Sequence, residues 1–164
     1  MKMLIKTVSN KDQLNTIENL AHEIWNAHYT PIIGKEQIRY MLEKYQSVEA
    51  MSEQIKNGSI YFLSEHNKLP IGYMSVNIET DTLFLSKLYV LESERCKGYG
   101  RQMIIHLELL SKEKNLNKIS LTVNKHNTQS IKMYEKVGFV ISGKVVKDIG
   151  QGFVMDDYQM EKSV

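Results

Sequence analysis

The chain has 164 residues, of which 42% are hydrophobic and 24% charged, and its formal net charge at pH 7 is +2. This length predicts a single domain over residues 1–164, and the near-neutral charge argues against a nucleic-acid partner. No apolar run reaches the roughly 20 residues of a membrane-spanning helix, and the N-terminus reads as a strand and not as a signal peptide, so we expect a cytoplasmic protein without a membrane partner. A single cysteine excludes an intrachain disulfide, and the five histidines lack metal-ligand spacing, so we expect no metal.

A strand and three helices are predicted in the first third of the chain. Apolar residues after Asn10 recur at steps of three, four and seven, which is typical of a helix with one buried face. Pro31 predicts a break after this helix. The predicted elements are a strand over Leu4–Val8, a helix from a Ser9 or Asn10 cap to about Tyr29, a break over Thr30–Gly34, and helices over Glu36–Lys44 and Val48–Lys56.

Strands dominate the rest of the predicted order. The segment Leu83–Val90 is apolar on both faces, which predicts a central strand, and a helix should connect it to a parallel strand by a right-handed crossover. The predicted elements are strands over Ile60–Ser64, Ile71–Ile78 and Leu83–Val90, a helix over Gly98–Lys114, a strand over Ile119–Val123, a helix over Thr128–Lys136, and strands over Phe139–Ile149 and Phe153–Glu161.

A loop with two glycines follows the central strand and opens a helix. Gly98 and Gly100 allow the backbone to approach a ligand, and the helix N-terminus offers unpaired N–H groups and the positive end of the helix dipole. Arg95, Lys97 and Arg101 add positive charge. The loop suits a pyrophosphate, although by itself a glycine turn with solvated basic residues fits equally well.

Three segments carry a resemblance to a known family. Arg95-x-x-Gly98-x-Gly100 is similar to a [Gln/Arg]-x-x-Gly-x-[Gly/Ala] motif, the segment 124–139 resembles a second hallmark, and 157–162 resembles a last strand. The family is the GNAT superfamily of acetyl-CoA-dependent N-acetyltransferases, and the resemblance spans essentially the whole chain. It implies an α/β (α+β) fold: a mixed, mostly antiparallel sheet of about seven strands, about four flanking helices and a central parallel pair. Residues 24–44 look most like the bacterial spermidine/spermine-acetyltransferase-like branch.

The resemblance implies an enzyme that moves an acetyl group from acetyl-CoA to a primary amine by direct attack in a ternary complex. The loop would hold the pyrophosphate of the cofactor, and the central strand would pair with its pantetheine arm. The implied cofactor-binding residues are Leu88, Tyr89, Val90, Arg95, Cys96, Lys97, Gly98, Tyr99, Gly100, Arg101, Asn127, Tyr134 and Lys136.

Two catalytic roles follow from the resemblance. The Val90 backbone N–H is the candidate oxyanion donor. Tyr134 corresponds to the tyrosine that protonates the departing thiolate, and a tyrosine hydroxyl with its usual pKa near ~10 stays protonated at neutral pH.

Asn127 corresponds to an asparagine that contacts CoA, and it is also a good helix cap. A covalent acyl-enzyme on Cys96 is disfavoured, because no partner pattern accompanies it.

The general base is open at this point. Many family members carry a glutamate where this chain has Phe84, which cannot accept a proton. An alkyl amine with a pKa near ~10.4 is almost entirely protonated at pH 7, so either its proton is removed or the enzyme selects the rare neutral form. Glu79, and His28 or Tyr89 acting through water, are the alternatives.

The acceptor is expected to lie near the end of the first long helix. Trp25, His28 and Tyr29 are the candidate substrate-binding residues. A small amine or a polyamine is the favoured acceptor; a peptide N-terminus is an alternative within the same chemistry, and a non-catalytic acyl-CoA sensor is an alternative outside it. The protein is expected to be a monomer or a homodimer.

Overall fold

The computed structural model describes residues 2–164, and over these residues it contains a seven-stranded sheet and five α-helices. The expected number of strands is confirmed, whereas the helices number five and not about four. The strand order is β1-β2-β3-β4-β5-β7-β6. The elements are β1 (Leu4–Thr7), α1 (Lys11–Ile33), α2 (Lys35–Gln46), α3 (Val48–Lys56), β2 (Ile60–His66), β3 (Leu69–Ile78), β4 (Thr82–Val90), a 3₁₀ turn (Glu92–Glu94), α4 (Tyr99–Glu113), β5 (Lys118–Asn124), α5 (Thr128–Lys136), β6 (Val140–Gly150) and β7 (Phe153–Ser163).

Strand β4 is the middle strand of the seven, as its apolar sequence predicts. Its pairing with β5 is parallel and covers four residue pairs, ending at Leu85 with Leu121. Both strands continue beyond that last pair. Leu83 and Leu85 are buried, but Phe84 is only half-buried, so the two faces of β4 are not equally covered.

The contacts within the chain define two compact units. Unit 1 comprises the residues up to Asn77 together with Lys87–Met103, and unit 2 comprises Ile78–Ser86 together with Ile104–Val164. Strand β4 and helix α4 each contribute residues to both units. Across the described part of the chain, no helix is long and apolar enough to cross a membrane.

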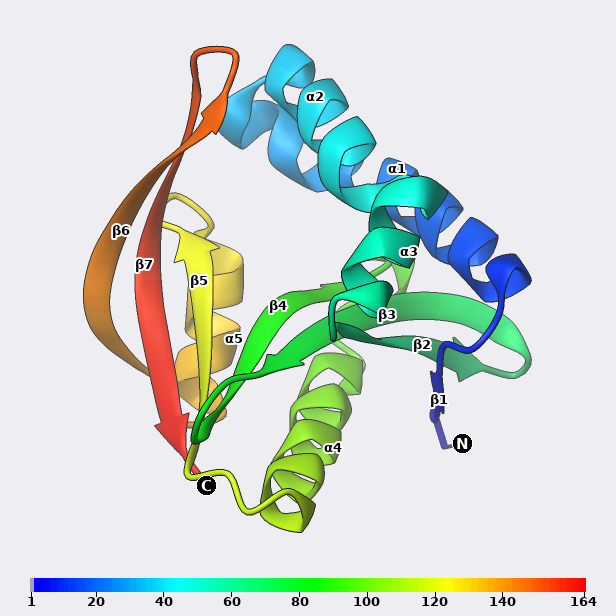
Figure 1. Cartoon of the computed structure of the whole chain (residues 1–164), viewed down its shortest axis with the longest axis vertical. Helices are drawn as coiled ribbons and strands as arrows, with labels where there is room; N and C mark the ends of the chain where they lie inside the picture. The colour runs from blue at the N-terminus through cyan, green and yellow to red at the C-terminus, as the bar shows by residue number, and fades with distance from the viewer. Residues whose placement is uncertain (1) are drawn as a thin grey trace. The chain divides into compact units, whose positions relative to one another are not determined.

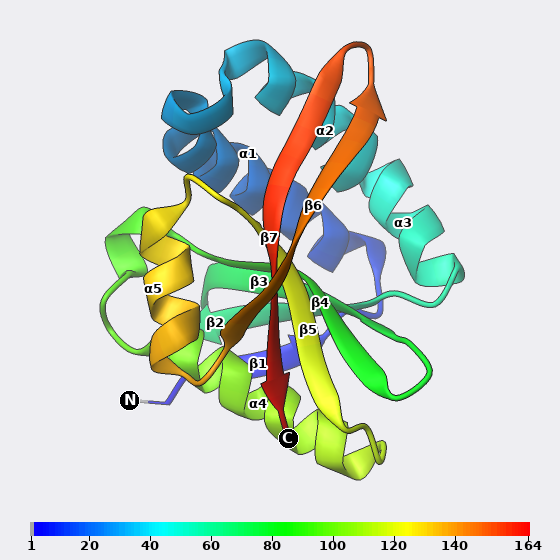
Figure 2. The ribbon, with the colours of Figure 1, turned by 90° about the vertical axis from the view of Figure 1, so that its left-hand side faces the viewer.

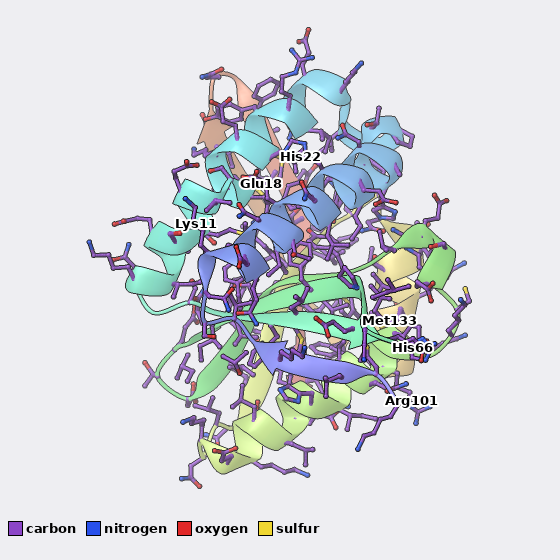
Figure 3. All side chains as sticks on the ribbon, turned by 90° about the vertical axis from the view of Figure 1, so that its right-hand side faces the viewer. Lys11, Glu18, His22, His66, Arg101 and Met133 are labelled. Atoms are coloured by element: carbon purple, nitrogen blue, oxygen red, sulfur yellow. The ribbon has the colours of Figure 1, made fainter. Side chains whose placement is uncertain are left out.

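Unit 1 places three helices against a small antiparallel sheet. Figure 1 shows α1, α2 and α3 gathered on one side of β2 and β3. Asn10 caps α1 in a capping box, because its side chain accepts from the Gln13 backbone N–H and Gln13 reaches back to the cap. Glu18, on α1 (Figure 3), accepts a hydrogen bond from the Val48 backbone N–H at 2.7 Å and so ties α1 to the start of α3.

Helix α1 continues through the segment where a break is predicted. It ends at Ile33, with Pro31 inside its last turn, so the predicted break over Thr30–Gly34 is wrong. A proline removes one backbone donor, but Gly34 donates to the Thr30 carbonyl at 3.0 Å and closes the turn beyond it. Gly34, at φ 88°, is the single residue between α1 and α2, a conformation that glycine adopts without strain.

Unit 2 is built on β5, β7 and β6. Figure 2 shows these strands side by side, with α5 next to them. Strand β7 pairs antiparallel with the whole of β5 through its residues from Asp157 to Ser163, and with β6 on its other edge. Ile119, Leu121 and Val123 alternate along β5 and are buried, and Met160, opposite Leu121, is fully buried with them. One face of this sheet is therefore the apolar core of unit 2.

Candidate active site

The loop after β4 has the backbone conformation of an anion-binding loop. Cys96 has φ 61° and Gly98 has φ 85°, so left-handed residues alternate with ordinary ones just before α4 begins. Such alternation turns successive N–H groups toward one side of the chain. A Cβ atom at Gly98 would meet nothing within 4 Å, so this position favours glycine because of its φ and not because of crowding.

The backbone N–H groups of this loop have no hydrogen-bond partner among the residues that the structure describes. In the part of the chain that the structure describes, none of the N–H groups from Cys96 to Arg101 donates a hydrogen bond; the first bond of the helix runs from Gln102 to the Gly98 carbonyl. These donors stand at a helix N-terminus, where the dipole also favours negative charge. The loop can therefore receive an anion with several acceptor oxygens.

The three basic side chains of the loop are in different situations. Arg95 donates through Nε to the Val90 carbonyl at 3.2 Å, and its Nη1 lies 3.5 Å from Nδ1 of His28. Lys97 forms an ion pair with Glu94 at 3.0 Å. Arg101 is exposed and pairs with none of the described residues. Arg101 is thus the basic side chain of this loop that is ready for a new anion.

Tyr99 does not present its ring to a ligand. It is buried, and its ring packs against His66 with centroids 5.5 Å apart. Figure 3 shows His66 on β2 and Arg101 on the first turn of α4 at the same end of unit 1. Tyr99 therefore anchors the start of α4 with its side chain, and only its backbone N–H is available to an anion.

The end of β4 is held by a close approach of β3. The Leu91 N–H donates to the Ile71 carbonyl at 2.8 Å. A Cβ atom at Gly72 would lie 2.3 Å from the Tyr89 carbonyl oxygen, a separation that no side chain tolerates. The glycine is therefore required for the position of the Tyr89–Val90 backbone, which is the segment expected to meet the pantetheine arm.

The candidate acceptor residues belong to an aromatic cluster. Trp25 and Tyr29 of α1 and Tyr89 of β4 stack edge to face, with centroids 5.5 to 6.1 Å apart. The hydroxyls of Tyr29 and Tyr89 lie 3.3 Å apart. His28 packs on Tyr29, 4.9 Å between ring centroids. Trp25, His28 and Tyr29 are thus brought to the strand and loop that begin the predicted cofactor site.

A buried polar network continues from this cluster and was not predicted from the sequence. The indole of Trp25 donates to the Tyr73 hydroxyl at 3.1 Å, and that hydroxyl donates to Gln46 at 2.5 Å. Gln46 donates to the Tyr61 hydroxyl at 3.2 Å, which donates to Gln54 at 2.5 Å. Burial raises the pKa of Tyr61 to about 12 and that of Tyr73 well above its usual value, so both hydroxyls stay protonated.

Lys87, on β4, is the charged neighbour of this network. Its ammonium lies 3.5 Å from Oε1 of Gln54 and 5.6 Å from the centre of the Tyr61 ring. Burial lowers the pKa of Lys87 to about 8. The alternation of Lys87 and Tyr89 along β4 was the available signal that both lie on the same side of the strand.

Three predicted cofactor residues lie in unit 2. Asn127 is buried and caps α5, accepting from the Ser130 backbone N–H at 3.3 Å, so the capping interpretation is confirmed. Tyr134 is buried on α5, with its ring 5.5 Å from that of Phe139. Lys136 is exposed at the last turn of the same helix.

Glu79, a predicted general base, is a residue of unit 2. It is exposed and lies in the turn before β4, where its N–H donates to the Thr82 carbonyl at 2.9 Å. Val90 ends the same strand, and an extended strand rises roughly 3.3 Å per residue. Glu79 therefore lies in the turn at the start of β4 and Val90 at its end, and the role of Glu79 as a general base stays a prediction.

The family of the chain can now be stated. The acetyltransferase (GNAT) family matches residues 17–139, more than half of the chain, so the chain belongs to this family. It is an acetyl-CoA-dependent acyltransferase, as the resemblance implied.

Relatives with known names and structures cover nearly the whole chain. The spermidine N(1)-acetyltransferase of Thermoplasma acidophilum is 27% identical over 161 residues, 95% of this chain and 97% of the relative. The PaiA N-acetyltransferase of the same organism, solved in complex with coenzyme A, has a TM-score of 0.86 and 22% identity over the full length of both chains. The spermidine N-acetyltransferase of Vibrio cholerae, solved with CoA and spermine, has a TM-score of 0.73 and 22% identity over 98% of this chain and 95% of that one. The expected fold is confirmed.

Proposed function

We propose that this enzyme transfers the acetyl group of acetyl-CoA to a small primary amine or a polyamine. The observation that carries the donor half of the proposal is the run of unpartnered N–H groups from Cys96 to Arg101 at the start of α4. Similarity to the relative from Thermoplasma acidophilum supports the acceptor half, since that protein is a spermidine N(1)-acetyltransferase.

The residues present fit a pyrophosphate. Phosphate oxygens need several donors, and the loop offers consecutive N–H groups, the helix dipole and the uncommitted Arg101 side chain. Lys97 can add a second charge if it leaves Glu94, because an exposed ion pair contributes at most about 1 kcal/mol. Arg95 keeps its hydrogen bond to the Val90 carbonyl and so connects the loop to the end of β4.

Acetyl-CoA supplies an activated thioester, and the chain's own residues supply positioning and charge stabilisation. The backbone of Leu88, Tyr89 and Val90 is proposed to hold the pantetheine arm, and the Val90 N–H to stabilise negative charge on the carbonyl oxygen. Tyr134 is proposed to give its proton to the departing sulfur. Asn127 and Lys136 are proposed as further cofactor contacts.

The aromatic cluster is proposed to receive the acceptor. A protonated amine is attracted to ring faces, and Trp25, Tyr29 and Tyr89 supply three rings beside the end of β4. His28 lies between this cluster and Arg95 of the loop. This position makes it a candidate to move a proton through water, together with Tyr89.

Cofactor binding is tested by calorimetry with CoA. Arg101→Ala should weaken binding about tenfold, because one charge-assisted phosphate contact is lost. Gly98→Ala should weaken it as well, because alanine resists φ 85°. Arg39→Ala removes an exposed arginine of α2 and is the matched control. Equal affinity in wild type and Arg101→Ala would contradict the assignment of the loop.

The reaction is tested by thiol release across a panel of amines. The panel contains spermidine, spermine, short diamines and a peptide with a free N-terminus. The exposed Cys96 thiol also reacts with the detection reagent, so the signal of the enzyme without amine is subtracted from each measurement. Release with polyamines supports the proposal, release with the peptide alone favours an N-terminal acetyltransferase, and no release with any amine overturns it.

A further inference from the structure

Asp157, on β7, is a largely buried residue whose carboxylate keeps some contact with solvent and has no compensating partner among the described residues. Its exposed fraction is 6%, and its side chain makes no hydrogen bond or ion pair with any residue that the structure describes. The adjacent Asp156, by contrast, forms an ion pair with Lys125. Burying an ionisable group without partners opposes folding. A group held in this way at a cost to stability is a candidate for a role in binding.

The side chain of Asp157 projects from the face of the unit 2 sheet opposite to its apolar core. Asp157 pairs with Asn124 of β5 and with Val145 of β6, and paired residues project from the same face. Val123, next to Asn124, belongs to the buried stripe on the other face. Asp157 is therefore a polar residue on the face of the sheet that the core of unit 2 does not use.

The same face carries Phe84, the position at which the resemblance predicts a glutamate in many family members. Phe84 pairs with Ser120 of β5, and Ser120 and Asn124 lie four residues apart on one face of that strand. Phe84 and Asp157 therefore project from the same face of this sheet. The chain lacks a carboxylate on β4 at this face and has an uncompensated one on β7.

We propose that Asp157 binds an ammonium group of a polyamine acceptor other than the nitrogen that is acetylated. The inference rests on the proposed function, because it needs an acceptor with more than one amine. An ammonium group has three donors and one positive charge, and a buried carboxylate without partners can satisfy both. The neighbouring cations do not occupy it: Lys118 on this face pairs with Glu161, and the exposed Lys147 of β6 makes no ion pair with it.

The ionisation state agrees with this role. Burial, and to a smaller extent the charge of Asp156, raise the pKa of Asp157 to about 6. The side chain is still mostly ionised at pH 7 and above, where an alkyl amine is cationic. An incoming cation would lower this pKa again, so binding and ionisation support each other.

Steady-state kinetics with spermidine test the inference. Asp157→Asn keeps the shape of the side chain and removes its charge, so we expect the KM for spermidine to rise at least tenfold. The kcat at saturating spermidine and the Kd of acetyl-CoA should change less than twofold, a split that a general structural defect would not produce. Asp156→Asn is the matched control, and its KM should equal that of the wild type.

The outcomes separate this inference from the proposed function. An active wild type together with an unchanged KM in Asp157→Asn overturns the inference and leaves the proposed function intact. An equal rise of KM in Asp156→Asn also overturns it, because it would show a general loss of negative charge. A wild type that releases no thiol with any amine overturns both. Thermal unfolding of each variant shows whether it is folded.

Discussion

The hydroxyl of Tyr73 is held between the indole N–H of Trp25, 3.1 Å away, and the side-chain oxygen of Gln46, 2.5 Å away. All three side chains are buried. This hydroxyl joins α1, α2 and β3, and through Trp25 it fixes the ring that packs on Tyr89. One oxygen atom therefore supports the aromatic cluster proposed for the acceptor.

Removing the Tyr73 hydroxyl should lower the free energy of unfolding by more than the loss of a single exposed hydroxyl would. Tyr73→Phe leaves a buried donor on Trp25 and a buried acceptor on Gln46 without partners, so we expect unfolding to become easier by about 2 to 4 kcal/mol. Urea denaturation monitored by fluorescence measures this. Tyr89→Phe removes a hydroxyl from a half-buried ring of the same cluster and should cost less than about 1.5 kcal/mol. Equal losses of unfolding free energy in Tyr73→Phe and Tyr89→Phe would show that burial of the network does not determine how much a hydroxyl contributes to stability.

Gly72 should not tolerate a methyl group. In Gly72→Ala the new Cβ would lie 2.3 Å from the Tyr89 carbonyl oxygen, so β3 and β4 must move apart. We expect a loss of about 2 kcal/mol or more in unfolding free energy, together with weaker CoA binding, because the Tyr89–Val90 backbone shifts. Gly143→Ala, whose Cβ would meet its nearest atom at 3.8 Å, should be nearly neutral. A Gly72→Ala protein as stable as the wild type would refute the close approach.

Tyr134 should matter for turnover and not for cofactor affinity. Tyr134→Phe keeps the ring that packs on Phe139 and removes the proposed proton donor, so kcat should fall about a hundredfold while the Kd of acetyl-CoA stays constant. Tyr40→Phe, on α2, is the control and should leave kcat unchanged. The proposed role would be contradicted by a Tyr134→Phe enzyme with wild-type kcat on its best amine.

The stability of the protein should depend on the charge of Asp157. Its pKa is raised from the usual 3.8 to about 6, so the folded state prefers the protonated form and stability falls as pH rises between these values. Asp157→Asn should therefore be more stable than the wild type at pH 8, by roughly 2 to 3 kcal/mol, and similar to it at pH 3.5. Melting temperatures of both proteins across this range measure the difference. A constant difference at all pH values would mean that the carboxylate is not the destabilising group.

Much of the local structure could be predicted from the sequence. The capping box at Asn10, the alternation in β4 and β5 and the glycines before α4 each depend on residues close together in the chain. The break predicted at Pro31 was wrong, because that prediction rested only on the local tendency of proline to disfavour a helix. In the structure, the Gly34 N–H completes the last turn of α1 beyond Pro31.

The amino-acid sequence by itself determined the order of the elements, the loop that opens α4 and the family to which the chain belongs, because periodicity, caps and motifs are properties of neighbouring residues. Only the tertiary structure decided which groups are free to act. It committed Lys97 to Glu94 and Arg95 to Val90, left Arg101 exposed, buried the ring of Tyr99 and left Asp157 buried without a partner. These outcomes depend on contacts between residues or on burial by distant segments. The residues next to a side chain in the sequence do not determine which residues it contacts in the folded protein.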